Sequence, residues 1–416
     1  MGYTKKVIAG FSWDTLLKIS TYFLTVIKIY ILARILTPSD FGVFSLVVIA
    51  LGLSEAMTQT GINLTIIQSK HSVEYFLNTA WVIAVGRGFL IGVLMIILGY
   101  LMSLFYDQSS LTLMIAVAAL VPVIKGFINP YVVVLHKKML YSKDVLYRFV
   151  VQAALILGTL LLGLWLKNVY ALILGMVIAA LIETALSFVI FKIRPQFQYV
   201  PSGAKIIFEN ARWLSVGSFL HYLVENVDDF LIGAITNTHS LGLYHNAYSI
   251  THKGSYDISK SVHYGTIPVF SKLVTDKNRL VKAFRKTLIS TTAITLLIAL
   301  PIYIFNQEIV LFLMGDKWIE SIPLIRPLIV AGVIQGFFMV CYTMMLASQK
   351  YKLMNLHLFG SLILMTSLII IGGNHSGLLG TVNGILYSRI ILSIPMLWYI
   401  FNFFKKSPST VAMAKS

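Results

Sequence analysis

The stretch NTAWVIAVGRGFLIGVLMIILGYLMSL (residues 78–104) decides the fold class of this chain. Arg87 is its one charged residue, and apolar or small side chains fill most of the other positions. About 20 residues of this kind, coiled as a helix, cross the hydrocarbon core of a bilayer. Over all 416 residues, 57% are hydrophobic and 12% are charged, whereas about 25% of a soluble domain is charged. The sequence therefore predicts an all-α, polytopic membrane protein.

Runs of comparable length recur along the whole chain and leave no room for a sizeable soluble domain. The eighth predicted span is too polar for hydropathy alone to identify, and we include it because the loop charges require an even number of helices there. We predict about twelve transmembrane helices, at residues 8–32, 41–62, 78–104, 111–134, 144–166, 170–191, 207–235, 240–264, 284–306, 323–347, 353–372 and 378–402.

Lysine and arginine residues in the connections between these helices fix the orientation of the chain. With the N-terminus inside, the inner segments hold 20 of them and the outer loops hold two, Lys167 and Lys317. Cytoplasmic loops keep the excess of positive charge. We therefore predict that both termini are cytoplasmic.

Two halves of six helices meet at KIRPQFQYVPSGAK (192–205), a polar segment with two prolines that is typical of a linker. A shift of 200 residues aligns Ile35 with Ile235 and FGVF (41–44) with LGLY (241–244). Such a pattern is expected for parallel repeats related by an axis along the membrane normal. The predicted pseudo-symmetric lobes are residues 1–198, with helices 1–6, and residues 199–416, with helices 7–12.

Seven basic side chains lie deep within the predicted spans. On insertion scales each costs about 2.5–3.5 kcal/mol at the bilayer centre, so seven facing lipid would cost about 20 kcal/mol, more than a typical fold stability. We therefore predict that they line a hydrated central cavity that binds an anion, for which a diphosphate offers strong acceptors. The candidate ligands of this basic cavity are Lys18, Lys28, Arg87, Lys125, Lys253 and Lys260, and the seventh cation is Arg389.

Four of these lysines have alternative interpretations, and for Lys253 and Lys260 the alternative is a helix end that lies elsewhere than predicted. Lys18 lies one helical turn after Asp14 and can form an ion pair with it near the membrane surface. Lys125 lies between Pro122 and Pro130, where a kink would let its side chain reach the interface.

Acidic side chains gather in SFLHYLVENVDDFLIGAI (218–235), a segment of membrane-spanning character. Acids at bilayer depth usually mark function. We interpret Glu225 and His221, one turn apart, as a proton-responsive pair, and take Asp228 and Asp229 as further ion-coupling candidates. The alternative for the two aspartates is a solvated position at the outer end of the helix.

Several kinds of site are not indicated. Cys341 is the single cysteine, so no internal disulfide is possible, and the Cys/His spacing of a metal site is absent. Glu55 and Glu183 are isolated acids that we interpret as packing or hydrogen-bonding groups. No Walker A sequence, nucleophile elbow or HExxH motif occurs. We expect no cofactor, no metal, no nucleic-acid partner and no enzymatic activity.

A series of short motifs runs along the chain, beginning with LARILTPSDFGVFSL (32–46) at the first hairpin. The series resembles the polysaccharide-transporter flippases, the Wzx-like O-antigen and capsule repeat-unit exporters of the MOP superfamily. In this resemblance Asp229 stands where the family often has an acid. The other motifs that carry it are GINLTIIQ (61–68), DDFLIGAI (228–235) followed by LGLY (241–244), IPVFSKL (267–273) and GDKW (315–318).

The resemblance implies two six-helix lobes of the MATE-like type, alternating access, and a place in the bacterial cytoplasmic (inner) membrane. It implies undecaprenyl diphosphate carrying an oligosaccharide as substrate, with H⁺ or Na⁺ as the candidate coupling ion and the polysaccharide assembly machinery as a candidate partner. Hydroxyl and amide groups that could contact the sugar are those of Tyr222, Asn226 and Tyr248.

We therefore expect a flippase for lipid-linked oligosaccharides. One alternative is a cation-coupled multidrug exporter of the same fold, which would prefer an acidic, aromatic pocket. Another is a polymerase or glycosyltransferase, for which the longest outer connection, residues 306–322, leaves little room. A non-transporting scaffold is the third.

Overall fold

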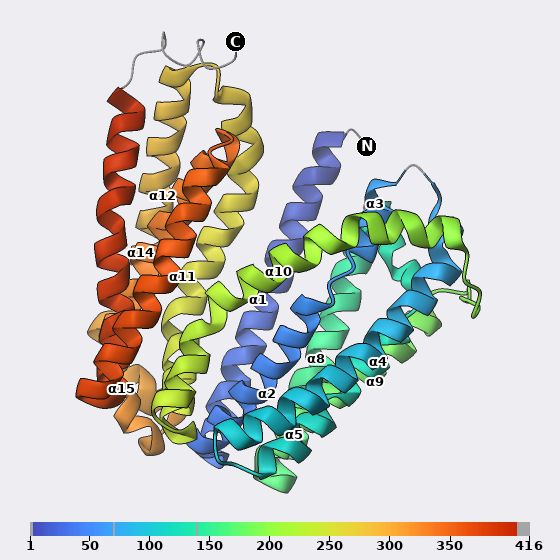
Figure 1. Cartoon of the computed structure of the whole chain (residues 1–416), viewed down its shortest axis with the longest axis horizontal. Coiled ribbons are helices and arrows are strands. Elements are labelled where there is room, and N and C mark those ends of the chain that lie inside the picture. The colour runs from blue at the N-terminus through green and yellow to red at the C-terminus, as the bar shows by residue number, and fades with distance from the viewer. Residues whose placement is uncertain (1–2, 70, 139, 406–416) are drawn as a thin grey trace. The chain divides into compact units, whose positions relative to one another are not determined.

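The computed structural model describes residues 3–69, 71–138 and 140–405, and within these the side chains of some helical residues are not described. The described chain is helical almost throughout and contains no strand (Figure 1). The α-helices are α1 (Tyr3–Ile35), α2 (Pro38–Met57), α3 (Ile62–Gln68), α4 (Val73–Phe105), α5 (Ser110–Ala118), α6 (Leu120–Gly126), α7 (Val134–Lys137), α8 (Tyr141–Leu166), α9 (Tyr170–Ile190), α10 (Pro201–Ile235), α11 (Thr238–Leu273), α12 (Lys277–Ile304), α13 (Asn306–Met314), α14 (Ile322–Ala347) and α15 (Tyr351–Lys405). Two 3₁₀ turns, η1 (Pro130–Val133) and η2 (Asp316–Ser321), complete the elements.

Many of these helices have the length and apolarity of membrane spans. Among the described residues, seven helices qualify, and an eighth span results if Ser110–Gly126 and Pro130–Lys137, which meet at a bend of 70°, count as one. α15 is interrupted by non-helical backbone at Ser376 and Gly377, between the two spans predicted there. The all-α membrane fold is confirmed, and the number of twelve helices stays a prediction.

Two compact units make up the chain, the first ending at Asn226 and the second beginning at Val227, inside α10. Each is described by itself below. Residues 191–200, at the predicted linker, are not helical. The predicted lobe boundary after residue 198 stays a prediction.

The 200-residue repeat is visible at the first hairpin of each half. α1 ends at Ile35 and α10 ends at Ile235. Thr37 and Asn237 then cap the following helices, each accepting a hydrogen bond from the backbone N–H three residues later, at 3.3 and 2.8 Å. A side-chain acceptor at this position satisfies one of the orphan N–H groups of a helix start. The eighth predicted span, which starts here, is indeed helical as part of α11.

Two predicted helices are broken. The span predicted at 41–62 ends at Met57, and α3 begins only after Gly61, whose φ of 63° is left-handed. The span predicted at 111–134 breaks after α6, where Asn129 accepts from the Tyr131 N–H and Pro130 starts a 3₁₀ turn. Apolar residues flank both breaks, so hydropathy joins the two sides into one span, although the turn residues between them are not helical.

Each unit has its own core. In the first unit, Ile66, Phe76 and Ile207 are fully buried and bring α3, α4 and α10 together. In the second, Phe338 and Cys341 of α14 pack with residues of α11, α12 and α15. The predicted site residues on these helices are therefore held by packed apolar faces.

Candidate functional site

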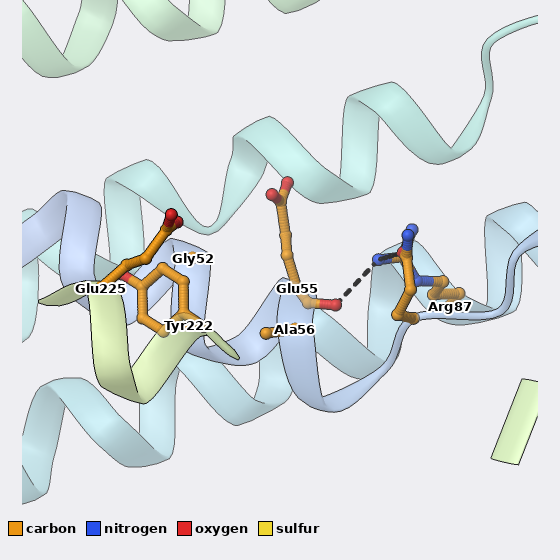
Figure 2. Close-up of a pocket in the computed structure, with 7 residues that line it drawn as sticks. Gly52, Glu55, Ala56, Arg87, Tyr222 and Glu225 are labelled. Carbon is orange, nitrogen blue, oxygen red and sulfur yellow. Dashed lines mark hydrogen bonds between the residues drawn. The ribbon is translucent and has the colours of Figure 1, made fainter. Parts of the chain in front are cut away.

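A pocket of about 430 Å³ lies within the first unit. Side chains of α2, α4 and α10 surround it (Figure 2). Three residues predicted for three different roles meet here, namely Arg87, Tyr222 and Glu225. The complete lining is Gly52, Glu55, Ala56, Gln59, Arg87, Tyr222 and Glu225.

Arg87 holds the end of α2 at the break before α3. Its Nε donates to the Thr58 carbonyl at 2.7 Å, and its Nη2 donates to the Glu55 carbonyl at 3.1 Å, drawn as the dashed line in Figure 2. Nη2 also donates to Gln59 Oε1 at 3.4 Å. The last carbonyls of a helix have no intrahelical partner, and a cation stabilises them. Arg87 therefore satisfies backbone carbonyls at a helix break within a predicted membrane span, where unpaired backbone groups facing lipid are not tolerated.

The guanidinium keeps donors to spare. It carries five N–H groups, and the three bonds above use one on Nε and two on Nη2. No partner for Nη1 is present in the part of the chain that the structure describes. These two N–H groups can bind an oxyanion that enters the pocket.

Carboxylates outnumber cations in this pocket. Figure 2 shows the side chains of Glu55 and Glu225 directed to the same side, with the Tyr222 ring beside them. Glu55, read from the sequence as a packing group, therefore lines the pocket. The signal that could have found it is its depth within a predicted span. The pocket combines one guanidinium, two carboxylates and a tyrosine, so it can bind both an anion and a cation.

Tyr222 lies directly against α2. Its hydroxyl donates to the Ile49 carbonyl at 3.1 Å. A Cβ added at Gly52 would lie 2.5 Å from Tyr222 Cε2, which is closer than carbon atoms approach. The absence of a side chain at position 52 therefore lets the tyrosine ring form one wall of the pocket.

Replacing Gly52 with alanine is expected to abolish transport, because the new methyl group displaces the Tyr222 ring. The matched control is Gly86→Ala on α4, where nothing lies within 4 Å of the added Cβ. Both variants would be compared for membrane insertion, thermal stability and transport. Equal activity of the two would show that the position of Tyr222 does not matter for function.

Several predicted residues lie outside the described side chains or outside the pocket. The side chains of Lys18, His221 and Lys253 are outside the described residues. Lys28 on α1 and Lys260 on α11 are partly buried, and Lys260 belongs to the second unit. The prediction that all six cations line one cavity therefore stays a prediction.

Lys125 is engaged in an ion pair. Its Nζ lies 3.3 Å from Glu183 Oε2 on α9, and 44% of the lysine side chain is exposed. Next to this pair, the Thr184 hydroxyl donates to the Ile124 carbonyl at 3.1 Å. Lys125 therefore links α6 to α9 in the first unit.

The ion pair predicts the behaviour of a double variant. Lys125→Met alone leaves Glu183 without its partner and is expected to lower stability, whereas Lys125→Met with Glu183→Met removes both charges and restores it. Transport by the double variant is expected to equal the wild-type rate. Loss of transport in the stably folded double variant would instead support Lys125 as a substrate ligand.

The second unit contains a separate polar cluster. Tyr244 Oη donates to Asp228 Oδ2 at 2.6 Å, and Asp229 Oδ1 lies 3.3 Å from His245 Nδ1. Asp228 and Asp229 are only 4% and 9% exposed, so the solvated alternative for them is wrong. Asp228 Oδ1 is buried and has no hydrogen-bond partner among the described residues.

Arg389 completes this cluster from α15. Its Nη1 donates to the Ala331 carbonyl of α14 at 3.0 Å, and its charge acts on Asp228. The sequence pointed to the acids and to Arg389 as a cation at bilayer depth, but not to the partners Tyr244 and His245. The signal that could have found these two is the LGLYH motif, because both partners lie 16 residues after their acids.

The predicted sugar contacts belong to different units. Asn226 is in the first unit, where its Nδ2 donates to the Tyr222 carbonyl at 2.9 Å. Tyr248 is in the second unit, with its ring centroid 5.7 Å from that of Tyr244. Asn226 therefore contacts the backbone of a pocket residue without lining the pocket, and Tyr248 packs beside Tyr244 of the acidic cluster.

Comparisons with known proteins find similarity along most of the chain. The model of a family described as polysaccharide biosynthesis protein matches residues 31–323. The lipopolysaccharide biosynthesis protein WzxC of Escherichia coli (strain K12) is 21% identical over 401 residues, which cover 95% of this chain and 80% of that protein.

Solved membrane transporters have the same fold. An inward-facing multidrug resistance MATE family transporter of the MOP superfamily matches with a TM-score of 0.68 at 15% identity, covering 95% of this chain and 96% of that one. The lipid II flippase MurJ, in an inward closed conformation, matches with a TM-score of 0.68 at 13% identity, covering 93% and 87%. At these identities the likeness shows the fold alone.

Proposed function

Because the chain belongs to the polysaccharide biosynthesis protein family, we propose that it is a flippase for lipid-linked oligosaccharides. Its substrate is an oligosaccharide repeat unit on undecaprenyl diphosphate, moved across the cytoplasmic membrane by alternating access. The observation that carries this proposal is the family match, which covers the first unit from residue 31 and reaches residue 323 of the second. The relative named for lipopolysaccharide biosynthesis supports it over 95% of the chain.

The pocket of the first unit supplies groups that suit such a substrate. The Nη1 donors of Arg87 bind a phosphate oxygen, and the Tyr222 ring offers a wall for a sugar. Glu55 and Glu225 accept hydrogen bonds from sugar hydroxyls. The polyprenyl tail stays in the hydrocarbon, since it gains nothing from a polar pocket.

The acidic cluster of the second unit suits ion coupling. Asp228 is buried with one oxygen lacking a donor, and Asp229 has His245 as neighbour. A proton or a sodium ion satisfies such a carboxylate. The cluster therefore supplies the ion-dependent step of the transport cycle. In this proposal the protein lies in the inner membrane with both termini cytoplasmic. The polysaccharide assembly machinery is its partner.

A multidrug exporter is the second candidate function. The two carboxylates and the tyrosine of the pocket are the observation in its favour, because such a site attracts organic cations. Both functions use the same fold. The family match favours the flippase.

Reconstitution into liposomes separates these two functions. A labelled undecaprenyl diphosphate oligosaccharide would be placed in one leaflet, and its arrival in the other measured with a label-quenching reagent that cannot cross the membrane. The expected result is protein-dependent transfer of this lipid and no protein-dependent ethidium uptake. Ethidium uptake without lipid transfer would overturn the proposal.

A further inference from the structure

A second hollow, of about 400 Å³, lies on the surface of α12 in the second unit. Its lining residues recur at every third or fourth position and so share one face of the helix. They are Lys282, Arg285, Lys286, Ile289 and Ser290. We call this feature the α12 hollow.

The α12 hollow has a strong surplus of positive charge. Six lysine and arginine residues occur between 272 and 286, against the single acid Asp276. Asp276 caps the start of α12 and pairs with Arg279 at 3.2 Å. The three cations of the hollow are exposed and have no ion-pair partner in the described part of the chain. They are therefore available to an external anion.

The hollow lies where α12 enters the hydrocarbon. About 20 residues cross that layer, and counting them back from Ile304, the end of the helix, reaches Arg285. The cations are at the end of α12 that we predict to be cytoplasmic. They are therefore expected at the depth of the lipid headgroups.

An apolar stripe continues from the hollow along the same face of α12. Ile289 is 57% exposed, and Leu297, Leu300 and Ile304 are 74%, 52% and 60% exposed. Their spacing of three, four or eight residues keeps them in line with Lys282 and Arg285. A cationic hollow followed by an exposed apolar stripe has the polarity profile of a phospholipid, with its headgroup above its acyl chain.

We propose that the α12 hollow binds the headgroup phosphate of an acidic phospholipid of the cytoplasmic leaflet. Clusters of four or more basic residues beside a transmembrane helix attract such lipids, at about 1 kcal/mol per residue. The acyl chain lies along the apolar stripe. This site does not depend on the proposed transport substrate.

The phosphate could also come from a polyprenyl diphosphate glycan. The hollow lacks the groups that such a headgroup needs, because its one hydroxyl, that of Ser290, donates to the Lys286 carbonyl at 2.8 Å. No aromatic ring or side-chain amide lines it. Its chemistry therefore favours a phospholipid over a lipid-linked sugar.

Native mass spectrometry of the purified full-length protein tests this site. Wild-type protein is expected to retain phosphatidylglycerol at least about tenfold better than phosphatidylcholine, as about 1.4 kcal/mol of charge attraction would give. The triple variant Lys282→Gln, Arg285→Gln, Lys286→Gln is expected to lose this preference. The matched control Lys272→Gln, Lys277→Gln, Lys352→Gln removes as many cytoplasmic charges and is expected to keep it.

Two results would overturn the proposal. The first is an equal loss of preference in both triple variants, which would show attraction by general charge alone. The second is displacement of phosphatidylglycerol by an equal amount of undecaprenyl diphosphate, which would make the hollow a substrate site.

Photocrosslinking of the wild-type protein gives an answer that needs no variant. A photoactivatable phosphatidylglycerol is expected to label the α12 segment 282–300. Labelling confined to other helices would contradict the site, even if the first triple variant failed to fold.

Discussion

Replacing Arg87 with alanine is expected to abolish surface glycan display while the protein stays inserted in the membrane. The Thr58 carbonyl would lose its Arg87 donor and the Glu55 carbonyl would keep, among the described residues, only the Thr58 hydroxyl at 3.4 Å, at about 1–3 kcal/mol for a buried group left unsatisfied. The pocket would also lose its guanidinium, and a charged hydrogen bond of about 1.5–3 kcal/mol corresponds to about a factor of ten or more in affinity. We therefore expect both a lower melting temperature and at least a tenfold loss of transport.

Two further variants separate these effects. Arg87→Lys keeps the charge but cannot reproduce the planar fork that binds two carbonyls, so it is expected to be intermediate in both measurements. Arg326→Ala removes an exposed arginine that lies over the Tyr303 ring, and it is expected to transport normally. If Arg87→Lys were as inactive as Arg87→Ala, Arg87 would act only by holding the end of α2. Normal glycan display in both Arg87→Ala and Arg87→Lys would refute a role of Arg87 in the pocket.

Replacing Asp228 with asparagine is expected to stop ion-driven transport without weakening the fold. Asparagine has nearly the same shape and still accepts the hydrogen bond from Tyr244, but it removes a buried charge. Because charges are costly to bury, a buried acid kept for function costs stability, and its neutral replacement is expected to melt at the same or a higher temperature. Reconstituted protein would be assayed with and without an imposed proton or sodium gradient, next to its melting temperature.

Tyr244→Phe is the matched control for this prediction. It removes the 2.6 Å hydrogen bond and keeps the carboxylate, so it is expected to slow transport without uncoupling it from the gradient. Gradient-driven transport by Asp228→Asn, together with loss of gradient dependence in Tyr244→Phe, would count against ion coupling by Asp228. If the Asp228→Asn variant melted at a lower temperature but its folded fraction transported at the wild-type rate, the aspartate would be a structural partner of Arg389.

Apolar periodicity predicted most of the fold. The long spans follow from the sequence because membrane crossing imposes a minimum apolar length. The polar eighth helix follows instead from the loop charges, and the matching helix ends at Ile35 and Ile235 from the 200-residue shift. The breaks after Met57 and after Gly126 could not be predicted in this way. Gly61 is the left-handed N-cap of α3, and Asn129 with Pro130 starts a 3₁₀ turn. Such short turns interrupt a helix while the apolar residues on either side still average to the hydropathy of one span.

The candidate site was predictable only in part. Charge at bilayer depth singled out Arg87 and Glu225, and the structure places both in the lining of one pocket. The partners of Arg87 are mostly backbone carbonyls, which become available only because α2 breaks. The pairing of Lys125 with Glu183 depends on which helices pack side by side, and a single sequence does not encode that in any local pattern.

The most direct test of the flippase is the leaflet in which its substrate accumulates. Cells lacking the protein would be analysed for undecaprenyl diphosphate glycans, with a sugar-modifying enzyme that cannot cross the membrane applied to sealed right-side-out and inside-out vesicles. The account predicts accumulation of the complete repeat unit in the cytoplasmic leaflet, reversed by the wild-type gene. The absence of accumulation, or a complete repeat unit already in the outer leaflet, would contradict it.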